Sequence, residues 1–405
     1  MIWSISWKNI WRSKVRSIVV ITAIALGLTA GIFSSAFFTG MVDQRINQAI
    51  SNEISHIQIH NPNFKENTDL GNYIHETSKA YNLVKDNPDV KGVSKRIIIY
   101  SMVASAETAA GVKIAGINPS DEKMVSGIST KIIDGEYFEG VKRNPVVIGK
   151  KLADKLKVKV RSKVVITLQD MDKNITGGAF RIAGIYESAN TGFDEKNIYV
   201  LDTDLTRLTA LPEGVCHEIA ILTNDNDLSM VVDDQLKKQL PELAVENWKE
   251  ISPEMSYMTE IMDLYNYIFI VIILFALLFG IINTMLMVVL ERRKELGMLL
   301  AIGMSKGKVF AMIMLETVLL SLTGGMAGIL LGWAISGYFG KHPINLSRWA
   351  EGYSQLGYDT VVYTTLDPSQ FVVVTIMVIL TGIIAALYPA YKALQYDPAE
   401  ALRIE

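Results

Sequence analysis

The chain has 405 residues, of which 50% are hydrophobic and 20% are charged, and its formal net charge at pH 7 is -3. This charge balance excludes a nucleic-acid binder by bulk charge, and the apolar residues are gathered in four blocks instead of being spread through a soluble core. Cys216 is the single cysteine, so no disulfide can form within the chain. The composition therefore predicts a membrane protein with a large water-soluble part that is held together by its core.

Residues 1–16 predict a helix that lies in the membrane interface. Trp3, Trp7 and Trp11 recur every four residues and so share one helix face, while basic residues lie between and after them. Such a face fits the boundary between the acyl chains and anionic headgroups. A signal peptide also begins with basic residues, but the uncharged stretch that follows is too long for its apolar region, and no clear cleavage site follows.

Residues 17–42 predict the first transmembrane helix. The stretch carries no charged side chain and is longer than the about 20 apolar residues that cross a bilayer. Gly27 and Gly31 form a GxxxG pair, which allows close contact with another helix. The basic residues that precede the helix place its N-terminal end in the cytoplasm and Asp43 outside.

Residues 43–263 predict a large extracytoplasmic domain. Strand and helix patterns alternate in 43–130 and again in 197–263, whereas 131–196 contains mostly short strands separated by polar turns. The expected domain therefore has an α/β part made of two separate segments, with a β-rich part inserted between them.

The first strand of this domain carries two histidines. Ile57 and Ile59 alternate with polar residues, which predicts one buried face. His56 and His60 share the opposite face and have the residue type of zinc ligands. Because no third ligand is in view, we expect exposed histidines on an edge strand and no metal site.

Three further apolar stretches complete a bundle of four transmembrane helices. The second and third are joined by a loop with five basic residues, and short loops rich in Lys and Arg stay in the cytoplasm. Both termini are therefore expected in the cytoplasm and the domain outside it. The expected segments are a second helix at 264–290, a cytoplasmic loop at 291–308, a third helix at 309–340, an outer loop at 341–367, a fourth helix at 368–391 and a cytoplasmic tail at 392–405.

The third transmembrane helix has two special features. Gly324, Gly328 and Gly332 repeat every four residues and make a flat stripe suited to helix packing. Glu316 is the one carboxylate within the expected spans, and an intramembrane acid is a functional candidate. Since it lies about two turns from the cytoplasmic end, we favour an anchor that pairs with a basic loop residue over proton coupling.

The loop between the second and third helices predicts a short amphipathic helix at the membrane surface. Leu296, Leu299, Leu300 and Ile302 recur at roughly helical spacing between two clusters of basic residues. A partner protein could grip such a helix.

Three segments resemble a known family. The stretch with Asn283, ERRKELG and a later AIG resembles the signature of the FtsX-like permease family of ABC systems. The C-terminal YPAYKALQYDPAEALR resembles its closing motif, although Tyr391 and Lys392 stand where paired basic residues are usual. The segment VVIGKKLADKLKVKVRSKVVI resembles the extracytoplasmic module of MacB-type and lipoprotein-releasing permeases, with Arg161 where a glycine is usual.

The resemblance implies the transmembrane subunit of a type VII ABC transporter, which transmits closure of cytoplasmic ATPase subunits to its outer domain and passes no substrate through the membrane. It implies a membrane α-helical fold of four transmembrane helices with an extracytoplasmic α/β + β domain, divided into Porter and Sabre parts as in the MacB-type periplasmic core domain. A second copy or a paralogue would complete a dimer. The ATPase-coupling residues that it implies are Glu291, Arg292, Arg293, Glu295, Gly297, Leu299, Ala301, Gly303 and Met304.

The sequence contains no GxxxxGK[ST] loop, and GMSKGKV at Gly303 has the wrong spacing. We therefore expect no catalytic residue, metal or cofactor on this chain, and ATP and Mg²⁺ on a partner ATPase.

The sequence is compatible with several hypotheses for the cargo. SHIQIHNP and AGINP resemble the LolC/LolE branch, which releases lipoproteins from the inner membrane to a periplasmic carrier. The alternatives are a MacB-like efflux or peptide-export permease with a periplasmic adaptor, an FtsX-like regulator of cell-wall hydrolases, and a sensor or adhesion protein with no ATPase.

Overall fold

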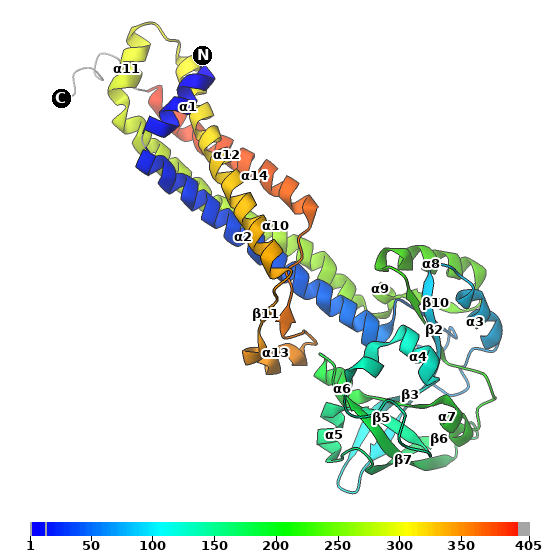
Figure 1. Cartoon of the computed structure of the whole chain (residues 1–405). Helices are drawn as coiled ribbons and strands as arrows, with labels where there is room; N and C mark the ends of the chain where they lie inside the picture. The colour runs from blue at the N-terminus through cyan, green and yellow to red at the C-terminus, as the bar shows by residue number, and fades with distance from the viewer. Residues whose placement is uncertain (1, 13, 396–405) are drawn as a thin grey trace. The chain divides into compact units, whose positions relative to one another are not determined.

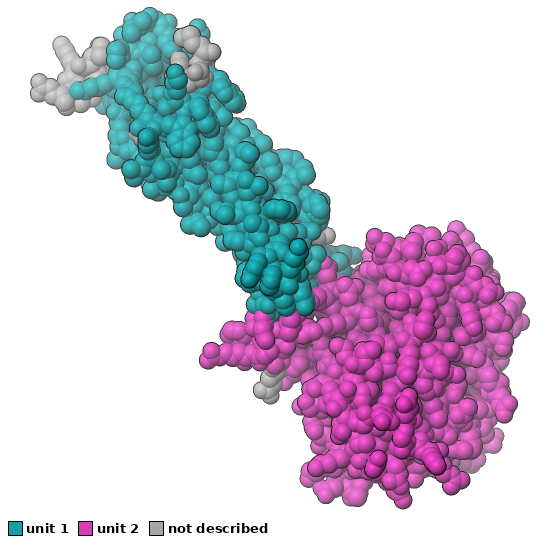
Figure 2. Space-filling model, viewed as in Figure 1, with its two compact units in different colours: residues 1–42, 259–344, 362–405 teal, residues 43–258, 345–361 magenta. Residues whose placement is uncertain are grey.

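The computed structural model describes residues 2–12 and 14–395 and contains two compact units, a helical unit and a sheet unit (Figures 1 and 2). Most of the predicted cytoplasmic tail at 392–405, including Arg403, lies outside the described residues. The helical unit comprises Met1–Val42, Thr259–Ile344 and Val362–Glu405, and the sheet unit comprises Asp43–Met258 and Asn345–Val361.

Within the described residues, four helices are long and apolar enough to cross a membrane, which confirms the predicted fold class. The second and third are separated by a short helix, as the helical spacing of the apolar residues in the loop predicts. The last span begins where Pro368 occupies the first helical position and the Asp367 carboxylate accepts the Ser369 N–H. The helices are α1 (Ile2–Arg12), α2 (Lys14–Ala49), α10 (Pro253–Glu291), α11 (Arg293–Ala301), α12 (Lys306–Phe339) and α14 (Pro368–Ala393).

The glycine stripe of α12 packs against α2. A Cβ atom on Gly328 would lie 2.8 Å from the Cβ of Leu28 and 2.9 Å from the carbonyl oxygen of Ala25. Gly324 and Gly332 face α2 in the same way, and the Thr29 hydroxyl donates to the Gly328 carbonyl at 3.2 Å. The stripe therefore brings two backbones together within one chain.

The glycine pair of α2 packs against α10. A Cβ atom on Gly27 would lie 3.3 Å from the side chain of Leu277, and one on Gly31 would lie 2.9 Å from that of Ile273. With the stripe on α12, these contacts place α2 between two neighbouring helices.

We expect Gly328→Leu to disrupt the bundle, because the backbone of α2 blocks the space that the new side chain needs. Overpacking of this kind costs about 1–3 kcal/mol or more. Leu330→Ala is the control, since Leu330 is 62% exposed on the same helix. In detergent, the midpoint of thermal unfolding should fall strongly for Gly328→Leu and only slightly for Leu330→Ala. Equal losses would contradict a special role for the stripe.

The sheet unit contains a ten-stranded sheet, part of which closes into a barrel. The strand order is β10-β1-β9-β2-β3-β8-β5-β7-β4, and β6 pairs with both β2 and β7, so that β2, β3, β8, β5, β7 and β6 form a ring. The strands are β1 (Ile57–His60), β2 (Val90–Ala104), β3 (Ala109–Ile117), β4 (Ile132–Gly135), β5 (Pro145–Gly149), β6 (Lys163–Gln169), β7 (Ile175–Tyr186), β8 (Asn197–Leu201), β9 (Glu218–Thr223) and β10 (Ala244–Asn247).

Two of the apolar cores in this unit belong to separate lobes. In the barrel, alternate residues of β6 such as Val164 and Ile166 point inward beside Phe180 of β7. In the other lobe, α3 (Thr77–Lys85) and α8 (Asn226–Gln239) cover β1, β9 and β10, with Ile59 and Val232 in the shared core. The barrel includes β3 and β8, so it takes in more of the chain than the predicted β-rich part at 131–196.

The remaining α-helices of the sheet unit are short, and those from α4 to α9 lie against the ten-stranded sheet (Figure 1). They are α4 (Pro119–Val125), α5 (Lys150–Leu156), α6 (Thr191–Lys196), α7 (Asp202–Thr209), α9 (Trp248–Ile251) and α13 (Ala350–Gln355), and a separate two-stranded sheet pairs β11 (Ile344–Asn345) with β12 (Val361–Val362).

Arg161 has a backbone conformation that glycine adopts more readily than other residues. Its φ is +70°, in the left-handed region, and its N–H donates to the Ile182 carbonyl at 2.8 Å. A side chain in this region costs roughly 1–2 kcal/mol, which glycine avoids. In the turn before β6, an arginine therefore adopts a backbone conformation that is typical of glycine.

The expectation of exposed edge-strand histidines is wrong. β1 lies between β9 and β10, and both His56 and His60 are buried. The His56 Nδ1 atom accepts the Thr223 N–H at 3.0 Å, and His60 Nε2 lies 3.4 Å from Glu218 Oε2. No group of three metal-binding side chains is found in the part of the chain that the structure describes.

Burial lowers the pKa of His56 to about 4, against a partial opposing effect of Asp225. Below pH 6.5 the unfolded chain binds a proton that folded His56 resists, so this group makes stability fall as the pH drops towards 4. We expect His56→Asn, whose oxygen can still accept the Thr223 N–H, to weaken this loss. Midpoints of thermal unfolding at pH 7, 6 and 5 check it.

Asp194→Asn provides the opposite control. Burial raises the pKa of Asp194 to about 6, so the native carboxyl contributes stability at low pH that is lost as the pH rises through 6. If both variants changed the pH profile in the same direction, the assignment of His56 would be wrong.

Candidate ATPase-coupling site

The short helix α11 is separated from its neighbours by two breaks in the backbone. Arg292 has a φ of -94° and a ψ of 17°, which ends the run from α10. At the other end, Gly303 has a φ of +96°, and the Met304 N–H donates to the Leu299 carbonyl at 3.0 Å. A glycine in this conformation is a common helix stop. Figure 1 shows α11 at the same end of the bundle as α1.

One face of α11 is buried against the bundle. Leu296 and Gly297 are buried, and Leu299, Leu300 and Met304 are half-buried against the same core. Of the predicted coupling residues, Gly297, Leu299 and Met304 therefore hold the helix in place with all or part of their surface.

The opposite face of α11 is exposed, with Lys294 in its first turn and apolar residues towards its C-terminal end. Ile302 is 78% exposed and Met298 is 48% exposed, and Ala301 and Gly303 are exposed beside them. Met298 and Ile302 were not among the predicted coupling residues. The first three residues of α11 are charged and the remaining six are apolar or glycine, so its periodicity over this short length did not reveal which face turns outward.

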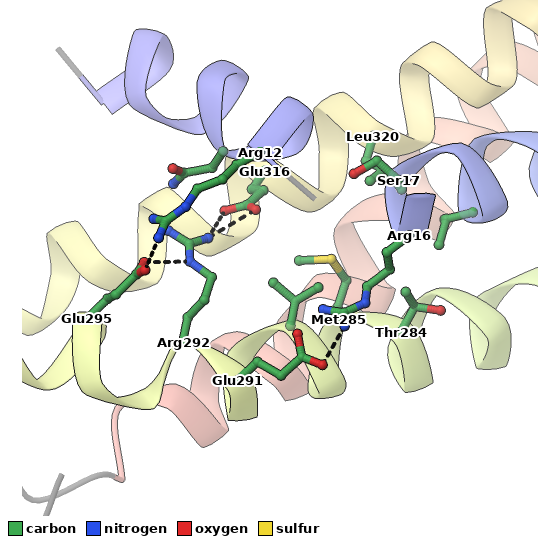
Figure 3. Close-up of a pocket in the computed structure, with 13 residues that line it drawn as sticks. Arg12, Arg16, Ser17, Thr284, Met285, Glu291, Arg292, Glu295, Glu316 and Leu320 are labelled. Carbon is green, nitrogen blue, oxygen red and sulfur yellow. Dashed lines mark hydrogen bonds and ion pairs between the residues drawn. The ribbon is translucent and has the colours of Figure 1, made fainter. Parts of the chain in front are cut away.

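Ion pairs connect α11 to two other helices (Figure 3). Arg292 donates to Glu295 at 3.1 Å and to both oxygens of Glu316 on α12 at 3.1 and 3.2 Å. Arg12 of α1 lies 2.5 Å from Glu295. Arg16 of α2 pairs with Glu291 at the end of α10.

Glu316 is buried, and its ion pair with Arg292 is the kind of contact that the anchoring interpretation requires. Removing one partner of a buried pair leaves an uncompensated charge, so this pair resists separation. Arg293 is half-buried beside it. The arrangement can therefore pass a displacement of α11 to α1 and α12.

The chain matches two protein families over adjoining regions. Residues 17–239 match the MacB-like periplasmic core domain, which is more than half of the chain, and residues 267–398 match the FtsX-like permease C-terminal region. The chain therefore belongs to the FtsX-like permeases that carry a MacB-like periplasmic core domain. It is an ABC transporter permease, a membrane protein with an extracytoplasmic domain.

Three known proteins show the range of similarity. The lipoprotein-releasing system transmembrane protein LolC of Xylella fastidiosa is 24% identical over 347 residues, which cover 82% of each chain. The macrolide export ATP-binding/permease protein MacB of Chlorobium luteolum is 35% identical over 126 residues, which cover 31% of this chain and 16% of that one. The crystal structure of the periplasmic region of MacB from Actinobacillus actinomycetemcomitans is 12% identical, with a TM-score of 0.35, over 49% of this chain and 92% of that one.

Proposed function

We propose that this permease couples ATP hydrolysis on a separate cytoplasmic ATPase subunit to movement of its extracytoplasmic domain. The observation that carries the proposal is the two-sided character of α11, which is buried and ion-paired on one side and apolar and exposed on the other. An ATPase groove that clasps Met298, Ala301 and Ile302 would move a helix already attached to the bundle. ATP and Mg²⁺ bind to that partner, and this chain holds no cofactor.

We propose that both termini lie in the cytoplasm and the domain on the periplasmic side of the inner membrane, because basic residues like those near α11 and α1 favour the cytoplasmic side. The permease would act as a dimer with a second copy or a paralogue.

We propose lipoproteins as the cargo, handed to a periplasmic carrier. The similarity to a lipoprotein-releasing permease extends over 82% of both chains, whereas the similarity to the macrolide exporter is limited to 126 residues. Macrolide or peptide export with a periplasmic adaptor is the second candidate, favoured by the higher identity within those residues. An FtsX-like role in regulating cell-wall hydrolases rests on the family match of the membrane region alone.

Reconstitution with the cognate ATPase in proteoliposomes tests both parts of the proposal. An acylated lipoprotein should stimulate ATP hydrolysis and be released to a soluble carrier with ATP but not with ADP. A macrolide in place of the lipoprotein should have no effect. Stimulation by the macrolide alone would favour the second candidate, and no interaction with any ATPase would refute the coupling function.

A further inference from the structure

A cavity of about 210 Å³ lies between α1, α2, α10 and α12, next to α11 (Figure 3). Its apolar part consists of buried side chains, among them Val20, Met285 and Leu320. Its polar part comes from the ends of the helices. The charged residues that line it are Arg12, Arg16, Arg292, Glu291, Glu295 and Glu316.

These six side chains carry three positive and three negative charges. A ligand with a single negative charge would gain from the arginines but would also face three carboxylates, and a simple cation would face three guanidinium groups. A ligand that carries both charges a short distance apart can satisfy the two sets together. The lining therefore selects a zwitterion.

The cavity lies at the end of the bundle that we expect at the membrane surface. Arg12 follows Trp11, and Trp3, Trp7 and Trp11 are exposed on α1. Exposed tryptophans mark the headgroup level of a bilayer. At this level the cavity has an apolar part next to a charged part. A phospholipid has the same arrangement, with its acyl chains next to its charged headgroup.

We propose that this cavity binds the headgroup of a phosphatidylethanolamine lipid from the leaflet at this end of the bundle. The phosphate lies at Arg12 and Arg16, and the ammonium lies at Glu291 and Glu295. A guanidinium has five N–H donors, and Arg12 and Arg16 each use one nitrogen in the ion pairs described above, so donors remain for a phosphate.

The ammonium distinguishes this lipid from phosphatidylcholine. A primary ammonium donates up to three hydrogen bonds to carboxylates, whereas a trimethylammonium donates none. The bound headgroup would connect α1 and α2 to the two glutamates on either side of Arg292. It would thereby stabilise the position of α11, whatever the cargo.

Native mass spectrometry of the detergent-solubilised full chain tests the site, with phosphatidylethanolamine, phosphatidylcholine and phosphatidylglycerol added at equal concentrations. The wild type should retain one phosphatidylethanolamine with roughly tenfold or greater preference over the other two lipids. Arg16→Ala should abolish the preference. Lys8→Ala is the matched control, because Lys8 is an exposed cation of α1 that does not line the cavity.

A paired substitution keeps the test valid if Arg16→Ala fails to fold. Arg16→Gln combined with Glu291→Gln removes both charges of one ion pair and leaves neither partner uncompensated, so the protein should fold and lose the lipid preference. Retention of the preference by this double variant would overturn the proposal, as would equal retention of all three lipids by the wild type. Displacement of the lipid by an equal concentration of soluble phosphoethanolamine would show a site for the free headgroup, which would also overturn it.

Discussion

Ile302→Glu is expected to abolish binding of the partner ATPase while the permease remains folded in the membrane. Ile302 is 78% exposed, so in the isolated chain the new carboxylate stays in water. In the complex it would enter an apolar contact. Loss of a buried isoleucine side chain alone costs about 1.5–3 kcal/mol, and an unpaired buried charge adds to this. We therefore expect affinity for the ATPase to fall by roughly 100-fold or more.

Ile175→Glu is the matched control. Ile175 on β7 is also 78% exposed but lies in the extracytoplasmic unit, so the same substitution should leave ATPase binding and stimulation unchanged. Leu299→Glu is a less clear test, because Leu299 is half-buried against the bundle and its replacement would also disturb folding. Copurification and ATPase stimulation measure the outcome. Full ATPase binding by Ile302→Glu would show that this face of α11 is not the contact.

The sequence predicted the membrane part well because its signals are local. A long uncharged stretch, a basic loop and glycines spaced four apart each act through neighbouring residues, and the structure has the corresponding helices. The partner of Glu316 was predicted as a class, a basic loop residue. The structure specifies Arg292, whose guanidinium reaches it from the break between α10 and α11.

The sheet unit was predicted less well because strand neighbours are distant in sequence. β1 pairs with residues 218–221 and 244–247, and no local pattern near Ile57 reveals that these segments cover both of its edges. The same reason hid the closure of the barrel by β6 against β2. The burial of His56 and His60 follows from the pairings of β1, and the pairing of β2 with β9 places Arg96 opposite Glu218.

Arg96→Met is expected to destabilise the extracytoplasmic unit severely. Arg96 on β2 is buried and donates to Glu122 of α4 at 2.6 and 3.0 Å and to Glu218 of β9 at 2.7 Å. Breaking a buried ion pair by removing one partner costs about 3–5 kcal/mol, because the remaining charge is left without compensation. For a domain of this size the unfolding midpoint should fall by roughly 10 °C or more.

The pH dependence of this loss identifies its cause. Burial alone would raise the pKa of Glu218, but Lys113 and Arg96 hold that pKa well below its usual value. Its carboxylate therefore contributes stability at neutral pH that is lost only in strong acid. Without Arg96, the buried Glu218 carboxyl group should take up a proton more readily. The difference in stability between Arg96→Met and the wild type should therefore widen as the pH rises from 5 to 8.

Arg207→Met is the matched control for this substitution. Arg207 also pairs with a carboxylate, that of Asp204, but its side chain is 66% exposed, and exposed pairs contribute about 0–1 kcal/mol. Adding Glu122→Gln to Arg96→Met should recover part of the stability, because it removes one of the uncompensated charges. Unfolding midpoints of the full chain in detergent measure all three variants. If Arg96→Met lost no more than Arg207→Met, the pairs of Arg96 with Glu122 and Glu218 would not be what holds β2, α4 and β9 together.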